Sequence, residues 1–201
     1  MEDLAYYSVI AINSIIGVRY CYLTIKKKIE PSLAMWIFFT IAVIGSLFSY
    51  LQEGDFSPSD NILNTSDIVL CSSISLTILL FGKKSSRFNR FDLFCLGAVS
   101  VILLFWFFSK EHFITNLSLQ LIQAIAYLPV VNRMWNAGES SESFLTWILI
   151  LTVSIISLFT TNGLLGLLYS ARAIFCVLTL LILMVRIEIK KAGRNRPIIK
   201  N

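Results

Sequence analysis

The chain has 201 residues, of which 56% are hydrophobic and only 14% are charged, and its formal net charge is +5. About a quarter of the residues of a soluble globular domain are charged, so this composition excludes that class of protein. The basic residues stand in short loops between apolar runs, where they set membrane topology, and we therefore exclude nucleic acid as a partner.

Apolar runs of membrane-spanning length follow one another along the chain. About 20 apolar residues cross the hydrocarbon core of a bilayer as a helix, and the sequence predicts seven such helices. Their expected ranges are 4–25, 33–51, 62–81, 91–108, 113–131, 144–160 and 164–187. As one helix, residues 144–187 would be roughly 65 Å long, about twice the thickness of the hydrocarbon core. The chain must therefore turn back, and the polar stretch Thr-Thr-Asn-Gly at 160–163 is where we expect the turn.

The loops between these spans alternate in charge. Basic residues follow the first, third, fifth and seventh predicted spans, whereas acidic residues follow the second. The basic residues are Lys26, Lys27, Lys28, Lys83, Lys84, Arg87, Arg90 and Arg133, then Arg186, Lys190, Lys191, Arg194, Arg196 and Lys200 near the C-terminus. By the positive-inside rule, this pattern predicts an N-terminus outside and a C-terminus in the cytoplasm, which requires an odd number of spans.

Two parts of the chain share a short pattern that indicates an internal repeat. Alignment of Trp36 with Trp147 also aligns Ser32 with Ser143, and it places the first three predicted spans on the last three. The fourth span has no counterpart in the repeat. Because a unit of three spans begins and ends on opposite sides of the membrane, this extra span gives the second unit the same orientation as the first. The sequence therefore predicts an all-α membrane protein of two parallel three-helix bundles joined by a linker helix (3+1+3). The expected divisions are a first repeat at 1–82, a linker helix at 83–110, a second repeat at 111–187 and a basic cytoplasmic tail at 188–201.

The sequence also predicts a role for the two aligned tryptophans. Trp36 and Trp147 each begin a predicted span at its cytoplasmic side. Tryptophan is enriched at membrane–water interfaces, so we expect both to act as interfacial anchors.

The predicted architecture is similar to that of a known superfamily. Tyr127-Leu128-Pro129 precedes a short loop and a Ser-x-x-x-Trp pattern. With the 3+1+3 order and the outside N-terminus, this resembles the SWEET and PQ-loop superfamily, which includes sugar carriers, lysosomal amino-acid carriers and the KDEL receptors. The family pattern has Pro-Gln in spans one and five, whereas here Val130 stands in place of the glutamine and residues 18–19 (Val-Arg) occupy the first-repeat position. The resemblance implies a divergent carrier in which spans three and seven line a central pathway.

Two charged residues lie inside predicted spans. Asp67 and Arg172 fall at equivalent places of the repeat, about a third of the way in from the outer face. A charge in hydrocarbon costs about 2.5 kcal/mol or more, so such residues normally face a cavity or a partner. Asp67 could accept a proton or a cationic group, and Arg172 could hold a carboxylate or a phosphate in a bidentate grip. The alternatives are a structural ion pair, or two side chains that snorkel to the outer surface.

Uncharged polar residues in the same spans are further candidates for substrate binding. Gln120, Gln123 and Tyr127 share one helical face of the fifth span. Asn13 lies in the first span, and Tyr169 precedes Arg172 in the seventh. We expect these side chains to line a site for a solute.

A proline near the end of the fifth span is a candidate hinge. Pro129 removes a backbone donor and can kink a helix, and a kink can act in alternating access. The alternative is a proline that is merely tolerated close to a helix end.

The sequence favours transport over chemistry. It contains no nucleophile–base pair, metal-ligand cluster, glycine-rich phosphate loop or paired catalytic carboxylates, so we expect no enzyme activity, no metal and no cofactor. We expect a multi-pass transporter of a small polar solute (a sugar, an amino acid or another small metabolite) in the cell membrane, working by alternating access, with a proton as a candidate coupled ion. The alternative is a non-transporting receptor or accessory membrane subunit of the same fold. Seven spans can enclose a pathway in a monomer, and an oligomer is possible although nothing in the sequence supports it.

Overall fold

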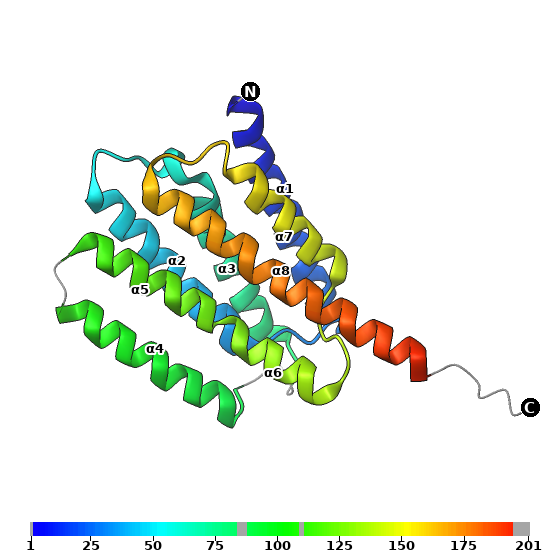
Figure 1. The fold of residues 1–201 in the computed structure, drawn as a ribbon. Helices are drawn as coiled ribbons and strands as arrows, with labels where there is room; N and C mark the ends of the chain where they lie inside the picture. The colour runs from blue at the N-terminus through cyan, green and yellow to red at the C-terminus, as the bar shows by residue number, and fades with distance from the viewer. Residues whose placement is uncertain (1, 84–87, 109–110, 195–201) are drawn as a thin grey trace, which may run out of the picture.

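A computed structural model describes residues 2–83, 88–108 and 111–194, and within these ranges the chain is all α-helical, with one short 3-10 helix and no strand (Figure 1). The elements are α1 (Glu2–Ile25), α2 (Leu33–Glu53), the 3-10 helix η1 (Pro58–Asn61), α3 (Ile62–Phe81), α4 (Arg90–Phe108), α5 (His112–Ile125), α6 (Tyr127–Ala137), α7 (Phe144–Ser157) and α8 (Gly163–Arg194). The predicted all-α class is confirmed.

Five helical segments in the described part of the chain are long and apolar enough to cross a membrane. They are Asp3–Ile25, Leu33–Glu53, Pro58–Phe81, His112–Asn136 and Gly163–Ala192. α7 is apolar but has only 14 residues. Large apolar side chains such as Phe48, Phe94 and Phe175 point outward and are exposed, whereas Asn116 and Gln123 are buried. This inverted distribution indicates a multi-pass membrane protein, because lipid solvates apolar surface and a bundle interior shelters polar groups.

The helices form two groups with the same packing order. In the N-terminal group, α3 lies between α1 and α2, and in the C-terminal group α8 lies between α7 and α5. The groups meet where α2 packs on α5 and where α1 packs on α7. α4 lies on the outside of α5 (Figure 1).

The two ends of the bundle differ in charge, and we name them accordingly. The basic end is where α1, α3 and α6 end, and it carries residues 26–28, Lys83 and Arg133. The acidic end is where α2 and α7 end, and it carries Glu53, Asp55 and Asp60.

Pro129 accounts for the break between α5 and α6. In a regular helix the N–H of residue 129 would bond to the carbonyl of Ile125, but proline has no N–H and its ring clashes with that carbonyl. α5 ends at Ile125, and Ala126 alone separates it from α6. The regular helix is therefore interrupted one turn before the proline.

The last helix is longer than its apolar run. The predicted span ends at 187, whereas α8 continues to Arg194. Residues 188–192 are strong helix formers apart from one isoleucine, so the backbone hydrogen bonds propagate past the apolar run. Lys191 contacts Glu139 at 3.6 Å, and the Arg186 guanidinium lies 5.3 Å from the ring of Trp135. Residues 195–201 of the predicted tail, and Lys84, Arg87 and residues 109–110 of the predicted linker, lie outside the described residues.

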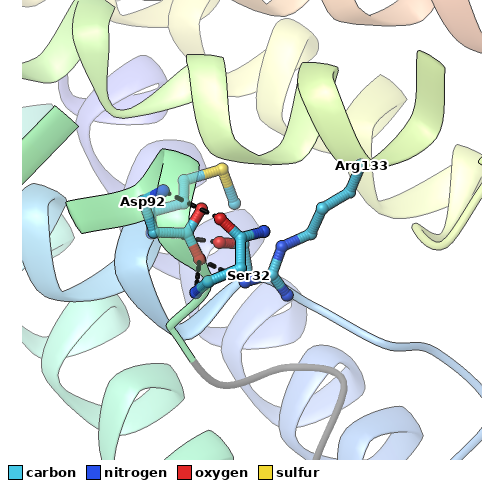
Figure 2. Close-up of polar contacts among 5 residues, drawn as sticks. Ser32, Asp92 and Arg133 are labelled. Carbon is cyan, nitrogen blue, oxygen red and sulfur yellow. Dashed lines mark hydrogen bonds and ion pairs between the residues drawn. The ribbon is translucent and has the colours of Figure 1, made fainter. Parts of the chain in front are cut away.

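A buried ion pair attaches α4 to the C-terminal group. Asn89 and Asp92 cap the start of α4 reciprocally, each side chain accepting the other's backbone N–H at 2.9 and 2.8 Å. The same Asp92 carboxylate contacts the Arg133 guanidinium of α6 at 2.5 Å. Figure 2 shows these two side chains facing each other beside Ser32, the N-cap of α2. Segments from α2, α4 and α6 therefore converge at the basic end.

Candidate functional site

A cavity of about 50 Å³ lies between the two helix groups. Side chains from both groups line it, and six of the predicted substrate-binding residues are among them: Asn13, Asp67, Gln123, Tyr127, Tyr169 and Arg172. The seventh, Gln120, does not line the cavity but bonds to Arg172. The structure therefore brings together residues from five helices, α1, α3, α5, α6 and α8.

The Asp67 carboxylate is held by neutral donors. Tyr169 Oη donates to Oδ2 at 2.7 Å, and Asn13 Nδ2 donates to Oδ1 at 2.9 Å. Asn13 Nδ2 also lies 2.7 Å from the Ser66 hydroxyl. Asp67 is thus oriented by one side chain from each helix group, Asn13 from the N-terminal group and Tyr169 from the C-terminal group.

The Arg172 guanidinium is held by amide oxygens and by an aromatic ring. Its Nε donates to Gln120 Oε1 at 3.0 Å, and its Nη2 donates to Gln123 Oε1 at 2.5 Å. Gln120 is in turn oriented through Nε2, which donates to Ser46 Oγ and to Asn116 Oδ1, both at 3.2 Å. The guanidinium carbon lies 4.6 Å from the centroid of the Tyr169 ring, within range of a cation–π interaction.

Tyr169 stands between the two charged groups. Its hydroxyl bonds to Asp67, and its ring faces Arg172. The ion pairs found within 4.0 Å in the described part of the chain include neither charged group. Both side chains point into the cavity. The structure therefore contains neither the direct ion pair nor the outward-pointing arrangement that were the alternatives for these two residues.

Two buried amide groups at the cavity have unused hydrogen-bonding capacity. Asn13 Oδ1 and Gln123 Nε2 have no partner among the described residues, although these residues are only 4% and 1% exposed. A buried polar atom without a partner costs about 1–3 kcal/mol. One acceptor and one donor are thus available beside the carboxylate and the guanidinium.

Polar contacts join the two helix groups at the acidic end. The Tyr50 hydroxyl donates to the Asn162 carbonyl at 2.9 Å. Asn162 also donates to Asp60 twice, from its side chain to Oδ1 and from its backbone N–H to the carbonyl, each at 2.9 Å. Phe56 stacks on Tyr50 with 4.7 Å between ring centroids. The loop after α2 is thereby fastened to the loop before α8.

A second set of contacts joins the two helix groups at the basic end. The Tyr20 hydroxyl donates to Glu142 Oε2 at 2.5 Å, and it accepts a hydrogen bond from Trp36 Nε1 at 3.1 Å. Trp147 Nε1 lies 3.4 Å from the same Glu142 oxygen. Nearby, the Glu30 backbone N–H donates to the Ser141 carbonyl at 2.9 Å.

The prediction that Trp36 and Trp147 are interfacial anchors is wrong. The two side chains are 2% and 1% exposed and line the cavity. The sequence shows only that each begins an apolar span, whereas the packing of α1 against α7 and of α2 beside α6 turns both indoles inward.

Glu142 is a buried polar residue at the basic end that sequence reasoning missed. It lies in the loop between α6 and α7, yet it is 7% exposed. Burial raises the pKa of Glu142 to about 7, and the hydrogen bonds from Tyr20 and Trp147 and the charge of Arg133 offset only part of this effect. A glutamate in a Ser- and Gly-rich loop normally indicates a solvated side chain, so no sequence signal pointed to it.

The described residues offer no group of three or more His, Cys, Asp and Glu side chains that could hold a metal ion. Comparison of the chain with protein families, with curated proteins and with solved structures finds no match. The chemistry of the cavity must therefore be inferred from the residues that surround it.

Proposed function

We propose that the chain is a carrier of a small polar solute, which binds in the cavity between the two helix groups and crosses by alternating access. The observation that carries this proposal is the cavity itself, where a carboxylate and a guanidinium are both held by neutral partners and remain unpaired with each other. Structural ion pairs neutralise charge, whereas separate, oriented charges beside a cavity are suited to a charged ligand.

The polar contacts at both ends support alternating access. They join the N-terminal group to the C-terminal group through Tyr50, Asp60 and Asn162 at one end and through Tyr20 and Glu142 at the other. Hydrogen bonds between polar groups can be exchanged for water at modest net cost, about 0.5–1.5 kcal/mol each. A cavity of about 50 Å³ holds only water-sized groups, so the helix groups must separate at one end before a solute can bind.

The charges favour a zwitterionic solute. The Arg172 guanidinium can take a carboxylate in a bidentate grip, and Asp67 can accept hydrogen bonds from an ammonium group. Asn13 Oδ1 and Gln123 Nε2 add one acceptor and one donor. A small amino acid satisfies all four groups, whereas a sugar would leave both charges uncompensated. Asp67 is also the candidate site for a coupled proton.

The packing supports the predicted duplication and topology. The middle helix of each group is the last in sequence, α3 in one and α8 in the other. This order agrees with two parallel repeats in which α4 is the odd span, which makes seven spans in all. It also agrees with the resemblance to the SWEET and PQ-loop superfamily. The basic end would then face the cytoplasm and the N-terminus the outside of the cell membrane.

A receptor or accessory subunit of the same fold is the second candidate, and one observation favours it. Val130 stands where the family pattern has glutamine, and its side chain is fully buried in the apolar core. The kink at Pro129 therefore lacks the polar neighbour that carriers of the family have at this place. Binding without uptake would identify this second function.

The test is ligand binding by the purified chain in detergent. Thermal unfolding would be followed at about pH 5.5 and 7.5 with panels of sugars, amino acids, organic anions and nucleosides. A ligand at 100 times its dissociation constant stabilises the folded state by about 2.7 kcal/mol. We expect stabilisation by a small amino acid that is lost in Asp67→Asn and in Arg172→Lys, because lysine keeps the charge but not the bidentate fork.

Asp55→Asn is the matched control, since it makes the same chemical change at an exposed position of the acidic end. It should leave binding unchanged. Uptake of the identified ligand into proteoliposomes then separates a carrier from a receptor. The proposed site would be refuted by a ligand that stabilises Asp67→Asn and Arg172→Lys as much as the parent protein. It would also be refuted if no ligand of any class stabilised the protein.

A further inference from the structure

The carboxyl group of Glu142 has an unusual setting at the basic end. Its Oε2 receives two hydrogen bonds, from the Tyr20 hydroxyl and from Trp147 Nε1, whereas its Oε1 is buried without a partner in the described part of the chain. A charged carboxylate distributes its charge over both oxygens and needs donors at both. A neutral carboxyl accepts hydrogen bonds at its carbonyl oxygen and donates from its O–H. Oε2 shows the first feature, and the buried Oε1 lacks the donors that would stabilise a full negative charge.

The same carboxyl group joins the two helix groups. Tyr20 belongs to α1 and is bonded to Trp36 of α2, while Glu142 and Trp147 belong to the C-terminal group. The ring centroids of Tyr20 and Trp36 are 5.0 Å apart. Because Tyr20 and Glu142 belong to different helix groups, a movement that separates the groups at the basic end breaks the bond between them.

We propose that Glu142 is a proton-binding site of this protein, and that its proton holds the basic end of the cavity closed. The site is distinct from the residues of the proposed solute site, and its role as a gate rests on the proposed function. The proton belongs on Oε1, which leaves Oε2 to accept the bonds from Tyr20 and Trp147.

The sign of the pH dependence follows from the two environments of the carboxyl group. In the closed arrangement burial raises the pKa of Glu142 to about 7, whereas a hydrated glutamate in an open arrangement has an ordinary pKa of about 4.5. The closed arrangement therefore binds the proton more tightly. It is most stable at low pH, and it loses stability relative to the open one as the pH rises through the range between the two pKa values. The ratio of closed to open protein falls by up to about ten-fold per pH unit there.

Two other titratable groups act on this carboxyl. Tyr20 from α1 bonds to it directly, and Arg133 from α6 favours its charged form. Arg133 is itself engaged by Asp92, whose carboxylate lies 2.5 Å from the guanidinium. Trp36 and Trp147, which approach from α2 and α7, do not titrate.

A native cysteine can report the opening. Cys71 lines the cavity on α3 and is 5% exposed, so a water-soluble thiol reagent reaches it only when an end opens. The parent protein for this test carries alanine in place of Cys21, Cys95 and Cys176. The labelling rate of Cys71 by a charged methanethiosulfonate would be measured from pH 5 to pH 8, in the parent and in the same protein with Glu142→Gln.

The labelling rate of the parent is divided by that of Glu142→Gln at the same pH, which cancels the pH dependence of the reactivity of the Cys71 thiol. Glutamine cannot ionise and can still accept both hydrogen bonds, so Glu142→Gln imitates the protonated carboxyl. We expect a ratio of parent to Glu142→Gln below about five at pH 5 that rises at least ten-fold further by pH 8. Glu139→Gln, in the same loop but with an exposed side chain, is the matched control and should behave as the parent.

A second measurement detects the proton on Glu142 directly and does not depend on opening of the cavity. Infrared difference spectra during a pH titration should show the carbonyl band of a protonated carboxyl group that disappears near neutral pH in the parent and is missing in Glu142→Gln. A titration of Glu142 below pH 5, or a labelling ratio that stays flat from pH 5 to 8, would overturn the proposal. Failure of the proposed solute site is distinguishable, because the ligand panel can fail while the labelling ratio still rises.

Discussion

The buried contact between Asp92 and Arg133 leads to a prediction of large magnitude. Arg133→Gln removes the guanidinium that lies 2.5 Å from the Asp92 carboxylate. The two side chains are 14% and 0% exposed, so the carboxylate that remains is cut off from water. Removal of one partner of a buried ion pair costs about 3–5 kcal/mol, because it leaves a buried charge without compensation. We expect about 3 kcal/mol here, the lower end of the range, because Asp92 still accepts the Asn89 N–H.

The free energy of unfolding would be measured by SDS titration of the protein in mixed micelles, with helix content as the signal. Asp92→Asn should cost less than Arg133→Gln, since asparagine preserves the cap of α4 and leaves no buried anion. The double variant should recover part of the loss, with a coupling energy of about 1–3 kcal/mol in the double-mutant cycle.

An exposed ion pair at the same end supplies the control. Lys83 contacts Glu30 at 2.5 Å, but the two side chains are 37% and 40% exposed. Exposed pairs contribute about 0–1 kcal/mol, so Lys83→Gln should change the free energy of unfolding by less than 1 kcal/mol. If Arg133→Gln and Lys83→Gln had equal effects, the reasoning from burial would be refuted.

Three further variants test the site and its ends. Tyr169→Phe removes the 2.7 Å hydrogen bond to Asp67 but keeps the ring, so solute affinity in thermal-unfolding titrations should fall about ten-fold or more; unchanged affinity would contradict the role of the hydroxyl. Pro129→Ala restores a backbone donor at the kink, and uptake into proteoliposomes should slow while solute affinity stays the same; unaltered uptake would exclude a hinge. Asn162→Ala removes the 2.9 Å side-chain bond to Asp60 and should speed thiol labelling of the cavity cysteine several-fold at every pH, a result that a merely structural loop would not give.

The sequence alone determined the all-α class and the positions of the long apolar helices. Apolar runs bounded by charged loops are a local property, because a helix in lipid satisfies its own backbone hydrogen bonds within about 20 residues. The interruption of the helix before Pro129 has the same local origin, since the missing N–H acts on the carbonyl four residues earlier. Asp67 and Arg172 stood out because a charge within such a run needs a sheltered environment.

The tertiary structure alone decided which side chains meet. The sequence does not show that Tyr169 separates Asp67 from Arg172, because that depends on the packing of α3 against α8. It does not show that Glu142 is buried, because a loop residue becomes buried only when helices from both groups close over it. Hydrophobic patterning specifies how each helix meets lipid, whereas contacts between polar side chains depend on the rotation and depth of each helix, which only the assembled bundle sets.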